Sequence, residues 1–213
     1  MTTTQSAPPT LLLPVGQFFG TFHPTAGSVD RYHRVRLGTE VWELDDARFT
    51  VWALAHGQAD QLAEQPWTMA ALREAAATHL PGDDVDLLLR ELFAEGLAAE
   101  VTPGTAGAAE FARRHRMGAR MLGLGNSSEQ PWLYSIGFYD RPLISVTRSV
   151  YDLWERSPSG ESLWTMCESL AEEERRAGGD DLDLVDPERM LAGLLTTLHH
   201  LLATSVVYLE PLP

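Results

Sequence analysis

The sequence contains no lysine, so all sixteen of its Lys/Arg cations are arginines. Without lysine the chain has neither the P-loop lysine of nucleotide-binding proteins nor a Schiff-base amine. Its single cysteine, Cys167, excludes an internal disulfide and a cysteine-cluster metal site, and favours a reducing cytoplasm. No apolar run approaches the roughly 18 residues that a transmembrane helix needs. No basic segment precedes Leu11–Leu13, as it would in a signal peptide. We therefore expect a cytoplasmic protein with no membrane partner.

Positive charges are also outnumbered: 16 Lys/Arg residues face 30 Asp/Glu residues, which gives a formal net charge of −14. A protein this acidic is repelled by phosphate backbones unless one of its surfaces is locally basic. The one basic cluster, at Arg113, Arg114, Arg116 and Arg120, lacks the aromatic and amide partners that nucleic-acid sites use. We do not expect nucleic-acid binding. Hydrophobic residues make up 44% of the chain, which is enough to build real cores.

Two short phrases each occur twice. Trp-Thr-Met stands at Trp67–Met69 and again at Trp164–Met166, and Gly-Asp-Asp-(Val/Leu)-Asp-Leu at Gly82–Leu87 and again at Gly179–Leu184. Both repeats have the same offset of 97 residues (67 to 164, and 82 to 179). A shared offset predicts a duplicated fold, and chance similarity of two acidic loops is the alternative.

Helix start signals accompany these phrases. Thr68 and Thr165 are candidate N-caps for a second helix in each copy, and Glu168 would complete a capping box with Thr165. In the second copy Asp186 is the candidate N-cap of the third helix, with Pro187 at its first position. In the first copy we also expect Asp46 to be the N-cap of the first helix, and Trp67 to pack on Leu72 as a hydrophobic staple.

The pattern predicts an α+β fold of two tandem winged-helix-type domains, each with a small β-hairpin or three-stranded sheet and three helices. Residues 1–30 form a loose tail with room for a first strand, and residues 31–101 form the first domain. Residues 102–131 are a linker, with a short basic helix over 108–122 and a loop over 123–131. Residues 132–213 form a second, more degenerate domain.

No residue pattern argues for catalysis, and we expect no catalytic residues, no metal and no cofactor. His199 and His200 are adjacent on a predicted helix, so their side chains diverge and do not chelate one ion. Cys167 lies near a helix start, which would lower its pKa, but the sequence shows no Cys/His/Asp arrangement that would make it a nucleophile. Whether the chain is an enzyme stays uncertain, and an accessory subunit is the expectation.

The first copy resembles the PqqD-like domains, also called RiPP recognition elements. The resemblance is carried by VWELDDARFTVWALAHG (41–57) and by WTMAALREAAATHLPGDDVDLLLRELFAEGLAAEV (67–101). The second copy, from SIGFYDRPLISVTRSVYDLWE (135–155) onward, is similar but looser, with an insertion before its third helix. The resemblance covers residues 31–101 well and residues 132–211 loosely.

This resemblance implies a peptide-binding site in each copy. Such domains bind the leader of a ribosomally made precursor peptide as an added strand, with leader side chains in a groove beside the third helix. In the first copy the implied peptide-binding residues are Thr39, Val41, Trp42, Glu43, Leu44, Leu88, Leu89, Arg90, Leu92 and Phe93. The second-copy candidates are Leu143, Ile144, Ser145, Val146, Leu195, Leu198 and His199.

The resulting expectation is a non-catalytic adaptor of RiPP biosynthesis that binds a precursor leader peptide and presents it to a peptide-modifying enzyme. The alternative is a tandem winged-helix scaffold or transcriptional regulator that acts through protein–protein contacts. Which copy binds stays open. A homodimer through the apolar stripe at Leu191–Leu202 stays open as well.

Overall fold

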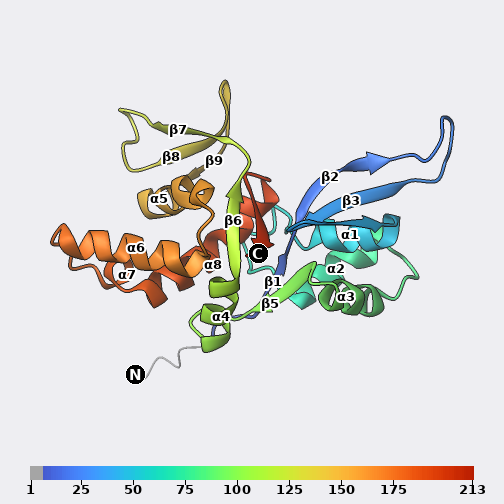
Figure 1. Ribbon diagram of the computed structural model, residues 1–213, viewed down its shortest axis with the longest axis horizontal. Helices are drawn as coiled ribbons and strands as arrows, with labels where there is room; N and C mark the ends of the chain where they lie inside the picture. The colour runs from blue at the N-terminus through green and yellow to red at the C-terminus, as the bar shows by residue number, and fades with distance from the viewer. Residues whose placement is uncertain (1–6) are drawn as a thin grey trace.

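The computed structural model describes residues 7–213 and shows an α+β protein. Within these residues eight α-helices accompany four small antiparallel sheets. Two groups of helices and strands lie side by side, with β1, β5 and β6 between them (Figure 1). No helix in residues 7–213 is long and apolar enough to cross a bilayer.

The first unit comprises residues 11–101. Strand β1 (Leu11–Pro14) is followed by a three-stranded sheet of β2 (Gln17–Phe22), β3 (Tyr32–Leu37) and β4 (Glu40–Leu44). Helices α1 (Asp46–Leu54), α2 (Met69–His79) and α3 (Val85–Ala94) then lead to β5 (Ala98–Val101). The hairpin turn between β3 and β4 includes Gly38, which has φ +60°.

The second unit comprises residues 115–211 and repeats this order. Helix α4 (Ala106–Arg114) leads into β6 (His115–Ala119), and β7 (Leu122–Asn126), β8 (Tyr134–Phe138) and β9 (Arg141–Val146) form its three-stranded sheet. Helices α5 (Arg148–Arg156), α6 (Leu163–Arg176), α7 (Leu182–Val185) and α8 (Pro187–Ala203) precede β10 (Val207–Pro211), and a short 3-10 turn (Ser157–Ser159) follows α5.

The two units match in register as well as in element order. The N-caps of α1 and α5, Asp45 and Thr147, are 102 residues apart (45 to 147). The N-caps of α3 and α8, Asp84 and Asp186, have the same separation (84 to 186). In each unit the last strand pairs antiparallel with the first, β5 with β1 and β10 with β6. This agreement supports a duplicated fold.

Matching aromatic clusters provide independent support. In the first unit His33 of β3 stacks on Phe49 at 3.9 Å between ring centroids, and Phe49 lies 6.0 Å from Trp52. In the second unit Tyr134 of β8 lies 5.0 Å from Tyr151, which lies 5.4 Å from Trp154. Each unit thus joins its middle strand to its first helix through three rings, the last of which is a tryptophan.

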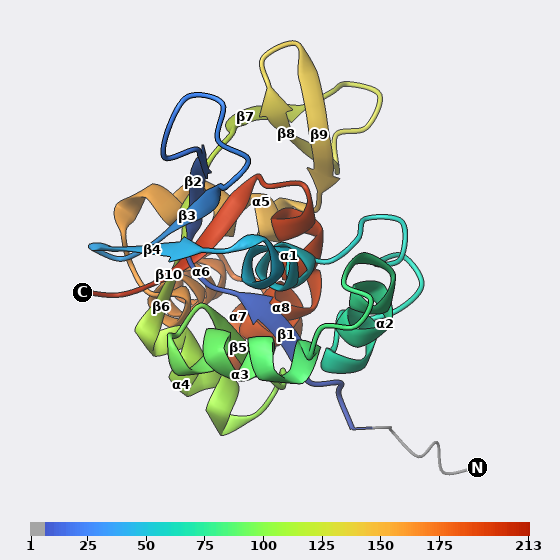
Figure 2. The ribbon, with the colours of Figure 1, turned by 90° about the vertical axis from the view of Figure 1, so that its right-hand side faces the viewer.

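Strand β1 belongs to both hydrophobic cores. Leu12 packs in the core of the first unit, whereas Leu11 and Leu13 pack in the core of the second. Alternate residues of a strand point to opposite faces, so β1 has one face in each core. This position explains why the whole strand is buried, whereas residues 7–10 before it are exposed. In Figure 2 the segment before β1 leads away from the rest of the molecule.

Polar contacts also join the two units. Glu210 of β10 is buried and accepts hydrogen bonds from Arg116, with Nε–Oε1 at 2.9 Å, while Arg36 of the first unit approaches its other oxygen at 3.9 Å. The backbone amide of Gly16 donates to the carbonyl of Leu209 at 2.7 Å. The units are therefore connected along β10 as well as through β1.

The structure corrects the interpretation of the repeated phrases. Thr68 does cap α2, but Thr165 lies inside α6, whose N-cap is Ser162, so the capping box with Glu168 is wrong. Asp84 caps α3, whereas Asp181 caps the additional short helix α7. The phrases recur at 97 residues while the N-caps of α1/α5 and α3/α8 recur at 102, so the phrases are not structural equivalents.

Other local predictions are also corrected. The N-cap of α1 is Asp45, not Asp46. Trp67 packs with Leu62, Ala71 and Ala75 in a small cluster, whereas Leu72 lies in the first core. The helix expected over 108–122 ends at Arg114, and the expected loop over 123–131 begins with strand β7. By contrast Asp186 and Pro187 do start α8 as predicted.

Candidate functional site

Strands β4 and β9, which contain most of the predicted edge residues, are edge strands. β4 pairs with β3 and β9 pairs with β8, and neither has a second neighbouring strand within residues 7–213. An edge strand presents unpaired backbone groups to which an extended peptide can bind. Each unit therefore has an edge strand at the position predicted for it.

In β4 the side chains alternate as the sequence indicates. Leu44 is buried and Trp42 is half-buried against the first core, while Val41 and Glu43 are exposed. Glu43 accepts hydrogen bonds from Arg34 on β3, at 3.0 Å from Nη2. Thr39 lies in the turn before the strand. The exposed face of β4 is therefore partly occupied by its own ion pair.

Two of the predicted first-copy groove residues belong to the core instead. Leu89 and Leu92 of α3 are fully buried, because they pack in the first core. Leu88 and Phe93 are half-buried against the same core. Arg90 is exposed and its Nε donates to the carbonyl of Asp86 at 3.1 Å. Of the five predicted α3 residues, only Leu88, Arg90 and Phe93 keep surface that a ligand could contact.

The second-copy candidates divide in the same way. Ser145 is exposed and Val146 is buried, while Leu143 and Ile144 are half-buried against the second core. Leu195 and Leu198 are core residues.

His199 does not line a peptide groove. It is buried, and its Nε2 donates to the backbone carbonyl of Leu12 at 2.8 Å. Burial lowers the pKa of His199 to about 4, so the ring is neutral at pH 7. This histidine thus links α8 to strand β1.

A groove of about 780 Å³ lies beside α8 in the second unit, between α8, α5 and α7. Its wall includes Thr147, which directly follows β9, and Gly193, on the exposed side of α8. A Cβ atom at Gly193 would meet no heavy atom within 4 Å, which shows that this part of the groove is open. Further lining residues are Ala7, Pro8, Pro103, Ser149, Val150, Leu153, Asp183, Leu184, Arg189, Met190, Ala192, Leu194, Thr196 and Thr197.

The corresponding space in the first unit is bridged by an ion-pair cluster. Arg48 of α1 pairs with Glu95 of α3, and its Nε lies 3.6 Å from Glu91. The positions 102 residues later are Val150, Thr197 and Gly193, all of which line the groove. The first unit therefore has a charged bridge between its first and third helices, and the second unit has small or uncharged side chains at the same positions.

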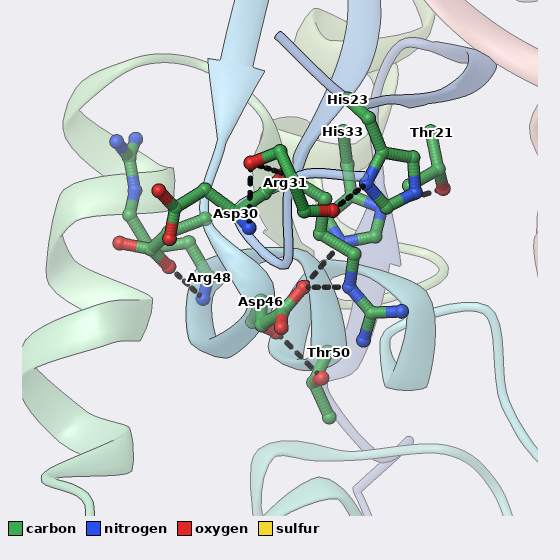
Figure 3. A network of polar contacts seen from close by, with 10 residues as sticks. Thr21, His23, Asp30, Arg31, His33, Asp46, Arg48 and Thr50 are labelled. Carbon is green, nitrogen blue, oxygen red and sulfur yellow. Dashed lines mark hydrogen bonds and ion pairs between the residues drawn. The ribbon is translucent and has the colours of Figure 1, made fainter. Parts of the chain in front are cut away.

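A hydrogen-bonded chain that the sequence did not reveal crosses the first unit (Figure 3). Asp46 accepts from Nε of Arg31 and from Nε2 of His33, both at 2.8 Å. The other ring nitrogen of His33 lies 2.9 Å from the hydroxyl of Thr21. The bond from Arg31, followed by that from His33, lowers the pKa of Asp46, so its carboxylate stays ionised. Hydroxyl, imidazole and carboxylate are thus aligned, on β2, β3 and α1.

This alignment resembles the order of groups in a nucleophilic triad, but its surroundings suit a structural role. Asp46 is exposed and neutralised by Arg31, and none of the cavities near it includes Thr21 in its wall. A triad needs a binding cavity and donors for an oxyanion next to the hydroxyl. The chain of bonds instead fastens β2 and β3 to the start of α1.

Cys167 is fully buried in the second core, and burial raises the pKa of its thiol to about 12. The thiol is therefore protonated at neutral pH and unsuited to nucleophilic attack. Over residues 7–213, no three His, Cys, Asp or Glu side chains converge as a metal site would require.

No protein-family model, no curated protein and no solved structure matches the chain.

Proposed function

We propose that the protein is a non-catalytic adaptor that binds the leader of a ribosomally made precursor peptide and presents it to a modifying enzyme in the cytoplasm. Each unit is then a winged-helix-type domain whose edge strand accepts the leader by strand addition. The observation that carries the proposal is the groove beside α8, which opens next to the end of edge strand β9. A leader strand on β9 would gain backbone hydrogen bonds, and its side chains would enter the groove.

The second unit is the better candidate for binding. In the first unit the Arg48 bridge to Glu91 and Glu95 joins the first and third helices, whereas the second unit leaves that space open. Arg148 lies at the start of α5 between the groove residues Thr147 and Ser149, and it is largely exposed, with its Nε 3.5 Å from Asp152. It is the cation that we assign to an acidic leader. Such a cation would offset part of the repulsion by a chain of net charge −14.

The test uses Gly193→Trp, which fills the groove, and Gly107→Trp in α4 as its matched control. Both replace an exposed helical glycine at a site where a Cβ meets no close neighbour, so both variants should fold. The tagged full chain is recovered from its native host, and short peptides bound to it are identified by mass spectrometry. The leader found is then synthesised and titrated by fluorescence anisotropy.

We expect Gly193→Trp to weaken leader binding at least tenfold and Gly107→Trp to leave it unchanged. Recovery of no precursor peptide, or equal binding by both variants, would overturn the proposal. Recovery of regulatory proteins alone, or recovery that depends on nucleic acid, would favour the scaffold or regulator alternative.

A further inference from the structure

A second cavity lies at the junction of the two units, away from the α8 groove. It measures about 250 Å³ and is lined from the first unit by the start of β2 and by α1, and from the second by the end of α8 and by β10. Its polar lining side chains are Gln17, His56, Arg120, Ser205 and Tyr208, and its aromatic ones include Phe18, Phe49 and Trp52. Ligand sites of proteins commonly combine an apolar wall with a few converging polar groups.

Arg120 stands out among the sixteen arginines, all of which lie within residues 7–213. Twelve form ion pairs with carboxylates, Arg90 bonds a backbone carbonyl, and Arg113 and Arg141 stack on aromatic rings. The guanidinium of Arg120 alone has no such partner in the described chain. Its backbone is fixed, because its amide donates to the carbonyl of Val206 at 2.9 Å. Arg120 is solvent-exposed, so in a chain of net charge −14 its guanidinium offers an uncompensated cation at the open side of the cavity.

His56 supplies a hydrogen-bond acceptor to the same cavity. Its Nδ1 lies 3.2 Å from the carbonyl oxygens of both Trp52 and Ala53, so Nδ1 bears the proton and donates to them. Nε2 is then unprotonated, and no group of residues 7–213 bonds to it. Burial, aided by His199 and then by the charge of Arg120, lowers the pKa of His56 to about 4 and keeps the ring neutral.

Ser205 adds a hydroxyl at a position where glycine would be easier to accommodate. It follows α8 with φ +55°, the one non-glycine residue in residues 7–213 with positive φ. The equivalent residue after α3 is Gly96, with φ +72°. The second unit therefore keeps a side chain at a strained position, and that side chain lines the cavity.

We infer that the junction cavity binds a small hydroxycarboxylic acid, with its carboxylate on Arg120 and its hydroxyl donating to Nε2 of His56. One cation favours a monoanion, because a dianion would leave an uncompensated charge in an acidic protein. Ser205 and Tyr208 can donate to the remaining carboxylate lone pairs, and the indole of Trp52 can contact the apolar body of the ligand. The cavity volume restricts the ligand to a small molecule.

The experiment uses the full chain with lactate, mandelate and 3-hydroxybenzoate as probes. Binding is measured by isothermal titration calorimetry, and the His56 ring signals are followed by NMR to locate the site. Arg120→Gln removes the free cation, and Arg141→Gln is the matched control because Arg141 also lacks an ion pair and lies outside the cavity. Neutral 3-hydroxybenzyl alcohol and inorganic phosphate complete the set.

We expect at least one hydroxy acid to bind, to shift the His56 signals and to lose at least tenfold in affinity in Arg120→Gln but not in Arg141→Gln. Absence of binding by all three acids would overturn the inference. So would equal binding of the neutral alcohol, or binding that is unchanged in Arg120→Gln. Binding of phosphate alone would replace the organic acid by an inorganic anion and would overturn the assignment to a hydroxycarboxylate.

Discussion

At the residue scale, His199 couples the stability of the molecule to pH. Its pKa in the folded chain is lowered to about 4, whereas an unfolded histidine titrates near 6.5. The unfolded state therefore binds more protons between these values, so the stabilisation is full above about pH 6.5 and is lost as pH falls toward 4. The complete shift corresponds to about 3 kcal/mol.

We predict that His199→Gln flattens the dependence of unfolding free energy on pH between 6.5 and 4.5. Glutamine keeps a donor for the Leu12 carbonyl but does not titrate. Urea denaturation at several pH values measures the slope, with His200→Gln as the control on the neighbouring, half-buried position. Parallel pH profiles of His199→Gln and the unchanged protein would contradict the prediction. The pKa of His56 is also lowered to about 4, so His56 adds a pH dependence of the same sign to the unchanged protein and to both variants.

At the element scale, the two third helices end in the same hydrogen-bonded motif. The amide of Gly96 donates to Phe93 and that of Leu97 to Leu92, and after α8 Ser205 donates to Leu202 and Val206 to Leu201. This is the Schellman arrangement, in which the left-handed residue is usually glycine.

We predict that Ser205→Gly stabilises the protein by about 0.5–1 kcal/mol, because glycine adopts positive φ without the cost borne by a residue with a Cβ. The reciprocal change Gly96→Ser should destabilise by a similar amount, since a Cβ there makes only an ordinary contact with Leu37. Chemical denaturation midpoints measure both changes. A loss of stability in Ser205→Gly would show that the serine hydroxyl compensates for the strain.

The elements that could be predicted from the sequence are those with local signals. The hairpin at Gly38 and the start of α8 at Asp186 and Pro187 follow from turn and capping chemistry. The prediction of Thr165 as an N-cap was wrong because Ser162, three residues earlier, is an equally good cap. The hydroxyl of Ser162 accepts a hydrogen bond from the amide of Thr165 at 3.0 Å. Local capping rules do not choose between two such residues.

Strands β1 and β7 lack the local signals that would fix their positions, although a possible first strand was expected within residues 1–30. Strand β7, LGLGN, contains two glycines and shows no clear alternation of apolar and polar residues. Strand β1 is apolar at every position, and its burial on both faces depends on two cores meeting. None of the predicted second-copy residues lines the α8 groove. Its wall includes Gly193 and Val150, which come together only in the fold and carry no local sequence signal.

At the scale of the whole molecule, the shared strand β1 predicts cooperative unfolding. Leu12 and Leu13 are both fully buried but in different cores. We predict that Leu12→Ala and Leu13→Ala each cost about 3 kcal/mol and that each variant, like the unchanged protein, unfolds in one calorimetric transition. Independent unfolding of the units would instead give two separate transitions, and each substitution would lower the midpoint temperature of only one of them.

The order of synthesis gives β1 a further consequence. Leu11 and Leu13 are synthesised long before Val207 and Leu209 of β10, although all four residues belong to the same core. While the chain is on the ribosome, the first unit can form around Leu12 with one apolar face of β1 still uncovered. Strand β10 then completes a core to which β1 contributes much earlier in synthesis, so a chain truncated before β10 would expose this face and be prone to aggregation.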